Sequence, residues 1–548
     1  MYAPLIDDDD CPISGKIEPI RPTEILCHIL QYVVGSDGVK ALLPSTHVSI
    51  SWRRAALGDS SLWTTIYLSQ TPPPLLDMIL ARAGNQLFTI HADHGDFERY
   101  ASLWVLVRRF EEFHYSAELG DLAPFLASLG PAPNLKVLRL RPESYQQVID
   151  ERMTRNTIPT IFSGCLPSLR HLSLPKTVVW PAGLFKGLTS LECGTISSFP
   201  VFPSFIFDAL RGSPLIESLH VVGCCLPVKG LNILPVHLSS LKKCTLIGEG
   251  IAPMIRFIIV PPTALISLGK PYVSDWTTFP HFSELSVAPG LRAIGEISSI
   301  SFSINNCAAR LQARNDHGGV LDVVVDGLND LSRDPSTFVL FIQSSFECWD
   351  ACPGLRTAKE LTLLVDRDRV WNEEEAMPFA LALARLVSNL SGIEGAKLYG
   401  VSPAELGTIL GLLIRAQPFE LECPNLKRLD IAPSANITSP SSLLMVLGNI
   451  FEVRKEAGAP FESVTVKLKC EKPVPVVFHC GFLAACEGLV GGGVRLEYER
   501  AKVKTLPTGR RRTHPEDGAA GTGDSGDDVA WDGWPENWPK TLEEMRGG

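Results

Sequence analysis

The sequence predicts an α/β protein in which a small three-helix unit precedes a parallel sheet with outer helices and a disordered C-terminal tail. Three observations support this prediction. Residues 17–68 carry apolar side chains at helical spacing, punctuated by Gly and Pro. A leucine motif then recurs irregularly over residues 131–500. Residues 501–548 are rich in Gly, Asp, Pro and charge, a composition typical of disorder.

The first predicted helix begins at Pro22, because Pro fits the first turn of a helix, where its missing N–H costs nothing. One apolar stripe with a period of 3.6 residues follows, formed by Ile25, Leu26, Ile29, Leu30 and Val33. The segment 35–38, Gly-Ser-Asp-Gly, is expected to end this helix.

Two shorter helical segments follow it. The second spans Val39 to Leu43 before Pro44, and the third carries Val48, Trp52, Ala55 and Ala56 before Gly58. Leu62–Trp63 begins a last apolar turn, and Ile66 and Leu68 indicate the entry to a strand. Because three short helices bury little surface alone, they are expected either to pack on the following domain or to bind a partner.

The residue identities over 17–68 add to this pattern, in the order Ile20, Pro22, Glu24–Ile25–Leu26, Ile29–Leu30, Val48, Trp52–Arg53–Arg54–Ala55 and Leu62–Trp63. The stretch resembles the F-box in the form common among fungal F-box proteins. Two features depart from that pattern: Arg21 separates Ile20 from Pro22, and Ser49–Ile50 replaces the usual Cys-Arg pair.

The resemblance implies docking onto the Skp adaptor of an SCF-type (Skp–cullin–F-box) ubiquitin ligase, and through Skp onto a cullin. The helical spacing fits helix-in-groove recognition. The expected partner-binding residues are Pro22, Ile25, Leu26, Ile29, Leu30, Val48, Trp52 and Trp63. For Val48, Trp52 and Trp63, a role inside the helical core is the favoured alternative.

The repeated motif is L-x-x-L-x-L with aliphatic or Cys substitutes. Clear cases begin at Leu135, Leu169 and Leu426, and weaker ones at Leu188, Ile216, Leu241, Phe282, Ala358 and Phe461. From Leu169 to Leu241 the starts fall 19, 28 and 25 residues apart, which matches leucine-rich repeats of roughly 20–29 residues. Such repeats stack into a solenoid whose x positions face a concave surface. The alternative is an ordinary α/β domain with leucine-rich strands.

Helices are expected between these strands, at 379–390, 403–415 and 441–455. The last of them places Leu444, Leu447, Ile450 and Phe451 on one face. Periodicity is weak near residues 290–350, where the array is expected to break or become irregular.

Composition excludes several classes of function. A formal net charge of −10 over 548 residues and the lack of a basic stripe argue against nucleic-acid binding. The 14 cysteines show no metal-ligand spacing, which indicates free thiols in a reducing compartment. The acidic run Asp7–Asp10 is unlike a secretory signal, and Arg256 and Pro261–Pro262 interrupt the best membrane candidate, 251–269. A cytoplasmic or nuclear protein without a membrane span is therefore expected.

No catalytic residue, metal site or cofactor site is predicted, because no phosphate loop, nucleophile elbow or zinc-protease motif occurs. His91-Ala92-Asp93-His94 is interpreted as a polar turn after a strand at 87–90 rather than as a metal cluster. Trp531, Trp534 and Trp538 in the tail form either a short docking motif or a cap on the last repeat.

The predicted organisation is therefore a disordered acidic N-terminus (1–16), an F-box (17–68), a connecting segment (69–130), a leucine-rich-repeat domain (131–500) and a disordered tail (501–548). The predicted function is a non-catalytic substrate adaptor of an SCF-type ubiquitin ligase, which binds an unknown target protein for ubiquitin-dependent degradation. Two rivals remain: an interaction scaffold whose N-terminal helices are a cap, and an enzyme or small-ligand receptor with a deep polar pocket.

Overall fold

A computed structural model of the chain describes residues 23–117, 119–142, 160–174, 183–194, 203–222, 234–248, 254–255, 257–270, 295–305, 308–326, 357–366, 381, 390, 392–401, 405–407, 409–410, 423–433, 440–470 and 476–500. Pro22, the motif start at Phe282, the N-terminus 1–16 and the tail with its three tryptophans lie outside these residues. In the part described, no helix is long and apolar enough to cross a membrane.

Five short helical elements form the N-terminal unit: α1 (Thr23–Asp37), η1 (Val39–Ala41), α2 (Leu42–Ser45), α3 (Ile50–Gly58) and η2 (Ser60–Trp63). Helix α1 continues two residues past the expected stop at Gly35, and the chain turns at Gly38, whose φ is 72°. Helix α3 begins at Ile50 because the Ser49 side chain caps it, accepting a hydrogen bond from the backbone N–H of Trp52 at 3.3 Å. Val48 therefore precedes the helix.

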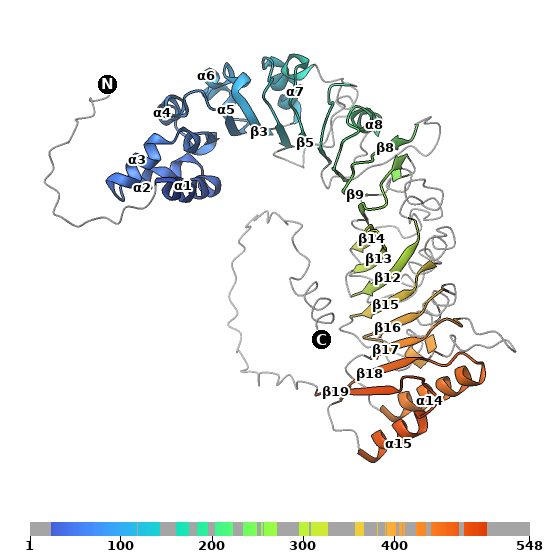
Figure 1. Ribbon diagram of the computed structural model, residues 1–548. Helices are drawn as coiled ribbons and strands as arrows, with labels where there is room; N and C mark the ends of the chain where they lie inside the picture. The colour runs from blue at the N-terminus through green and yellow to red at the C-terminus, as the bar shows by residue number, and fades with distance from the viewer. Residues whose placement is uncertain are drawn as a thin grey trace, which may run out of the picture. The chain divides into compact units, whose positions relative to one another are not determined.

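Seventeen strands of the described residues form one sheet (Figure 1). The first nine pair in parallel in the order β1 (Thr65–Tyr67), β2 (Phe88–Asp93), β3 (Phe110–Ala117), β4 (Val137–Pro142), β5 (His171–Leu174), β6 (Ser190–Cys193), β7 (Ser218–Val222), β9 (Lys243–Ile247) and β11 (Leu265–Lys270). A separate parallel pair joins β8 (Val236–His237) to β10 (Ile258–Ile259).

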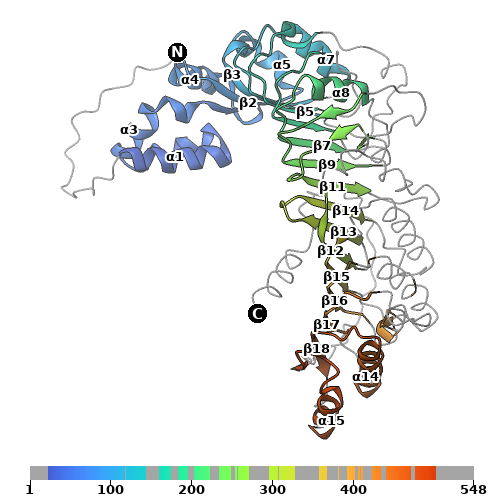
Figure 2. The same ribbon diagram turned by 45° about the vertical axis from the view of Figure 1, so that its right-hand side comes forward.

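An antiparallel insertion lies in the middle of the sheet, where the sequence periodicity is weak. Its strands are β12 (Ile297–Ile304), β13 (Ala308–Asn315) and β14 (Val320–Asp326). Strand β14 pairs in parallel with β11, β13 pairs antiparallel with both neighbours, and β12 pairs in parallel with β15 (Glu360–Val365) (Figure 2). The parallel pattern then resumes through β16 (Gly395–Tyr399), β17 (Arg428–Ala432), β18 (Ser463–Cys470) and β19 (Val494–Arg500).

The leucine motif marks buried strand positions. In each described copy of the motif, the three apolar positions are less than a tenth exposed, as at Leu135, Leu138 and Leu140. The sheet nevertheless starts at β1, well before the expected residue 131. The motif misses β2 and β3 because their buried positions hold aromatic and isoleucine side chains such as Phe88, Ile90 and Phe113.

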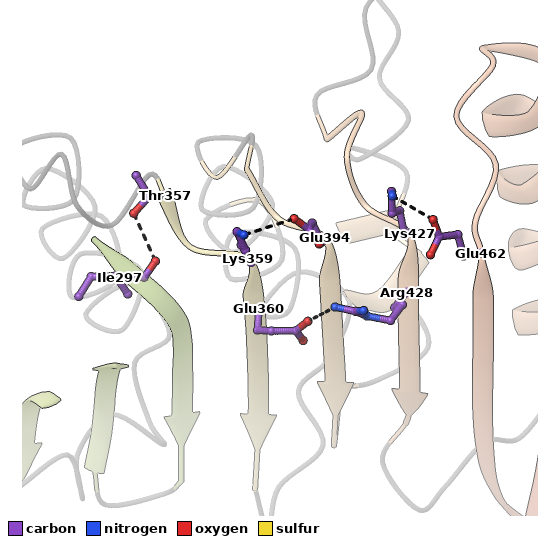
Figure 3. Close-up of polar contacts among 8 residues, drawn as sticks. All are labelled: Ile297, Thr357, Lys359, Glu360, Glu394, Lys427, Arg428 and Glu462. Atoms are coloured by element: carbon purple, nitrogen blue, oxygen red, sulfur yellow. Dashed lines mark hydrogen bonds and ion pairs between the residues drawn. The ribbon is translucent and has the colours of Figure 1, made fainter. Parts of the chain in front are cut away.

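The residues just before the strands are linked in register along one end of the sheet (Figure 3). The backbone N–H of Glu394 donates to the carbonyl of Lys359 at 2.8 Å, and that of Glu462 donates to Lys427 at 2.7 Å. The side chains alternate in charge, with Lys427 Nζ 3.0 Å from Glu462 Oε1. Each exposed ion pair contributes little stability, but the alternation favours this register over one in which a strand is shifted by a residue.

Helices connect the strands: η3 (Leu68–Gln70), α4 (Pro73–Ala83), α5 (Asp96–Arg99), α6 (Ala101–Trp104), η4 (Val107–Arg109), α7 (Leu119–Ser128), η6 (Ile161–Gly164), α8 (Pro203–Arg211), α14 (Pro440–Glu456) and α15 (Val476–Cys486). Helix α14 confirms the expected helix at 441–455, and its four predicted face residues are buried. Of the other two expected helices, 403–415 is helical where it is described, at 405–407 and 409–410, and 379–390 lies almost entirely outside.

Candidate partner-binding surface

Helix α1 has one buried face and one exposed face. Leu26 and Leu30 are 2% and 0% exposed, whereas Ile25, Ile29 and Tyr32 are 51%, 37% and 83% exposed. The exposed three are spaced i, i+4 and i+7, so they lie on one side of the helix. The helix therefore presents an apolar stripe to solvent while a second stripe holds it in place.

The buried stripe packs in a core that the later helices supply. Trp63 is fully buried, and its Nε1–H donates to the backbone carbonyl of Ala56 at 2.8 Å. This bond satisfies the indole group while its rings fill the space between helices. Trp63 is thus a core residue, and Trp52 is half-buried against the same core.

A second pair of exposed apolar side chains lies around the start of α3. Val48 is 63% exposed in the turn before the helix, and Ile50, its first residue, is 53% exposed. Between them, Ser49 is occupied in capping the helix. Exposed Val, Ile and Tyr side chains on so small a helical unit are typical of a surface that a partner covers.

Contacts with the following elements fix this helical unit in place. Arg82 of α4 donates from Nη1 to the carbonyl of Leu57 at 3.4 Å, and Gln86 donates from Nε2 to Ser60 Oγ at 3.2 Å. On the other side, Gly38 approaches the ring of Tyr67 in β1 so closely that any Cβ would collide with it. The helices are therefore continuous in packing with the sheet.

The expected partner-binding residues thus fall into two groups. Ile25, Ile29 and Val48 are exposed, whereas Leu26, Leu30 and Trp63 face the core of the isolated chain. The apolar residues of α1 were predicted to form one stripe. Because the helix is covered on one side only, part of this wide band packs in the core and the other part is exposed to solvent. Tyr32 and Ile50 were missed, although Tyr32 continues the i, i+4, i+7 series from Ile25.

The polar turn predicted at His91–His94 is wrong for its first three residues. His91 and Asp93 belong to β2, and the turn is confined to His94–Gly95. The strand continues because the alternation of buried and exposed positions runs on through Ala92. Across the described part of the chain, no three His, Cys, Asp or Glu side chains gather as a metal site.

An open groove of about 810 Å³ lies between α14 and α15 in the part of the chain that the structure describes. Its lining is mainly apolar, with Leu444, Met445 and Phe482 among the side chains, while Asn449 and Glu452 are polar. This groove is not the deep pocket of converging polar groups that an enzyme or small-ligand receptor requires.

Comparison with known families matches residues 22–69 to the F-box-like family. No curated protein matches the chain. The matched range begins at Pro22 and spans the helical unit and β1. F-box domains generally bind the Skp adaptor, and the match supports a role as an F-box adaptor in SCF-type complexes.

Proposed function

We propose that this protein is the substrate-recognition subunit of an SCF-type ubiquitin ligase, with the fungal type of F-box that its sequence resembles. The observation that carries the proposal is the stripe of Ile25, Ile29 and Tyr32, exposed on the helix that opens the F-box-like domain. Its spacing is that of an amphipathic helix laid into a partner's apolar groove. Skp is the partner, and a cullin joins through Skp.

The parallel sheet is the arm that holds the target protein in this proposal. Its buried leucines and register-matched strands support a leucine-rich-repeat solenoid interrupted by the antiparallel insertion of β12–β14. The side chains that alternate with the leucines along each strand form a continuous face. Such extended faces serve repeat proteins as binding surfaces for other proteins.

The proposed mechanism is proximity, without a catalytic residue in this chain. Holding the target beside a charged conjugating enzyme raises the effective concentration of a target lysine, which leads to ubiquitin-dependent degradation. The proposed location is the cytoplasm, the nucleus or both, where this machinery works.

The decisive experiment is a titration of the full chain with the Skp adaptor of its own organism. The test variant is Ile25→Asp with Tyr32→Asp, because both side chains are at least half exposed and a carboxylate there opposes burial in an apolar groove. We expect wild type to bind and this variant to lose binding, with unchanged circular dichroism.

The matched control is Val105→Asp with Leu215→Asp, which puts two carboxylates at exposed apolar positions outside the F-box-like domain. The control is expected to bind Skp as wild type does. A well-folded wild type that does not bind Skp contradicts the proposal and favours the scaffold alternative, in which the N-terminal helices are only a cap.

A further inference from the structure

Four side chains stand in register on one face of the sheet, across the first four strands. Tyr67 pairs with His91, His91 with His114, and His114 with Arg139. Their neighbours on each strand, among them Ile66 and Phe113, are buried on the opposite face. These four residues and Arg141, which lies two residues further along β4, are together called the basic ladder.

The rings of the basic ladder stack on one another. The centroids of Tyr67 and His91 are 4.2 Å apart with an interplanar angle of 8°, and those of His91 and His114 are 4.3 Å apart at 30°. Because the rings lie face to face across neighbouring strands, the stack presents ring edges along the sheet and ends at the strand that carries Arg139. No motif in the sequence indicates this stack, because its residues come from three separate strands.

The arginines of the basic ladder differ from others in the sheet. Arg310 pairs with Asp322 at 2.7 Å, Arg495 pairs with Glu497 at 2.9 Å, and Arg428 pairs with Glu360. Arg139 and Arg141 are exposed and form no ion pair with any carboxylate in the described part of the chain. Two guanidinium groups on one face of one strand are therefore open to a ligand.

On the strands that flank β4, two carboxylates occur: Glu111, which pairs with Lys136, and Glu112, so the two guanidinium groups outnumber the carboxylates left to them. Glu112 accepts a hydrogen bond from His114 Nε2 at 3.3 Å, and Asp93 and Glu192 each stand two strands away from β4 in register. The chain as a whole carries a formal net charge of −10, so this patch is positive on an acidic molecule. Such local contrast steers an acidic ligand to one place.

The histidines themselves contribute little charge at neutral pH. The pKa of His91 is lowered from 6.5 to about 4, first by burial and then by the nearby His114, Arg139 and Arg141. Burial likewise lowers the pKa of His114, against the opposing effect of Glu112. Both arginines thus lie near enough to the histidine rings to disfavour their protonation. The ring stack is therefore neutral beside two cationic side chains.

We propose that the basic ladder binds an acidic peptide segment of the target protein, an inference that rests on the proposed adaptor function. A guanidinium group donates two parallel hydrogen bonds to one carboxylate, so the two exposed arginines bind two acidic side chains. The exposed edges of the stacked rings contact the peptide's backbone or an apolar side chain. From β1 to β4 the ladder spans roughly 14 Å, which is about four residues of extended chain.

The test is fluorescence anisotropy of the full chain with a labelled hexaglutamate peptide, at about 50 mM and about 300 mM NaCl, because salt screens exposed charges. The test variant is Arg139→Ser with Arg141→Ser. Its control, Lys397→Ser with Lys467→Ser, removes two positive charges from exposed positions on strands β16 and β18 of the same sheet. Hexalysine and a dT6 oligonucleotide serve as comparison probes.

We expect wild type and control to bind hexaglutamate equally, more weakly at higher salt, and the test variant to bind at least about tenfold more weakly. Arg139→Lys with Arg141→Lys is expected to recover part of the affinity. Unchanged binding by the serine variant, or binding of dT6 as tight as that of hexaglutamate, overturns the inference.

Skp titration of the same preparations separates the two proposals. The Arg139→Ser/Arg141→Ser variant is expected to bind Skp like wild type, which also shows that it is folded. Loss of Skp binding by wild type with hexaglutamate binding retained refutes the adaptor function and leaves the ladder as an acidic-peptide site. Skp binding without any hexaglutamate binding refutes the ladder alone.

Discussion

Two neighbouring positions on α1 separate the core of the helical unit from its binding surface. Leu30 is fully buried and Tyr32, two residues later, is 83% exposed. Truncating a fully buried leucine to alanine costs about 2–5 kcal/mol, because apolar contact is lost and a cavity remains. Truncating Tyr32 changes folding free energy by about 0.5 kcal/mol or less, since its ring is in water and alanine favours the helix.

The assay is hydrogen exchange of backbone amides in residues 23–63, followed by Skp titration. Leu30→Ala is expected to speed exchange by about thirtyfold or more, which corresponds to the lower end of that cost. Tyr32→Ala is expected to leave exchange unchanged and to weaken Skp binding by about tenfold or more, as for an aromatic anchor.

The reasoning fails if the two variants exchange roles. Unchanged amide exchange in Leu30→Ala together with lost Skp binding would show that Leu30 reaches the partner directly, as the sequence first suggested. Accelerated exchange in Tyr32→Ala would show that the exposed stripe is part of the fold. Ile25→Ala provides an independent check, because Ile25 lies on the same exposed face.

Two further predictions concern the sheet. Gly400→Ala is expected to destabilise the β15–β16 region by at least about 2 kcal/mol. The φ of Gly400 is 70°, and a Cβ there would collide with the backbone carbonyl of Val365 in β15. Hydrogen exchange of the two strands measures this loss of stability. The pKa of His91 is lowered from 6.5 to about 4, so the unfolded chain binds this proton more tightly than the folded chain. Stability is therefore lost as the pH falls from 6.5 to about 4. Thermal melting curves of His91→Phe over this pH range are expected to show less of this loss.

Each of these predictions has a matched control. At the other end of β16, the added Cβ of Gly395→Ala meets the flexible carboxylate of Glu360. Moving that carboxylate disturbs the exposed ion pair between Glu360 and Arg428, so the expected cost is less than about 1 kcal/mol. Equal losses at Gly395 and Gly400 would contradict the strand register. For pH, the exposed His47→Phe is the control, and an equal effect from it would rule out the stacked ring as the cause.

The sequence by itself determined the local elements of this protein. Proline and glycine punctuation with helical spacing predicted the N-terminal helices, and the leucine motif predicted which strand positions are buried. The helix at 441–455 and the irregular middle also followed from periodicity. These features are readable because burial repeats with the period of each element, and neighbours in sequence are neighbours in space.

The tertiary structure decided what distant residues do together. Whether Leu30 or Tyr32 faces a partner depends on which side of α1 the core of Trp63 covers, and sequence spacing shows only that both sides are apolar. The stack of Tyr67, His91 and His114 exists because strands far apart in sequence pair in one register. Pairing partners and covered faces are properties of the packed chain, which no single segment encodes.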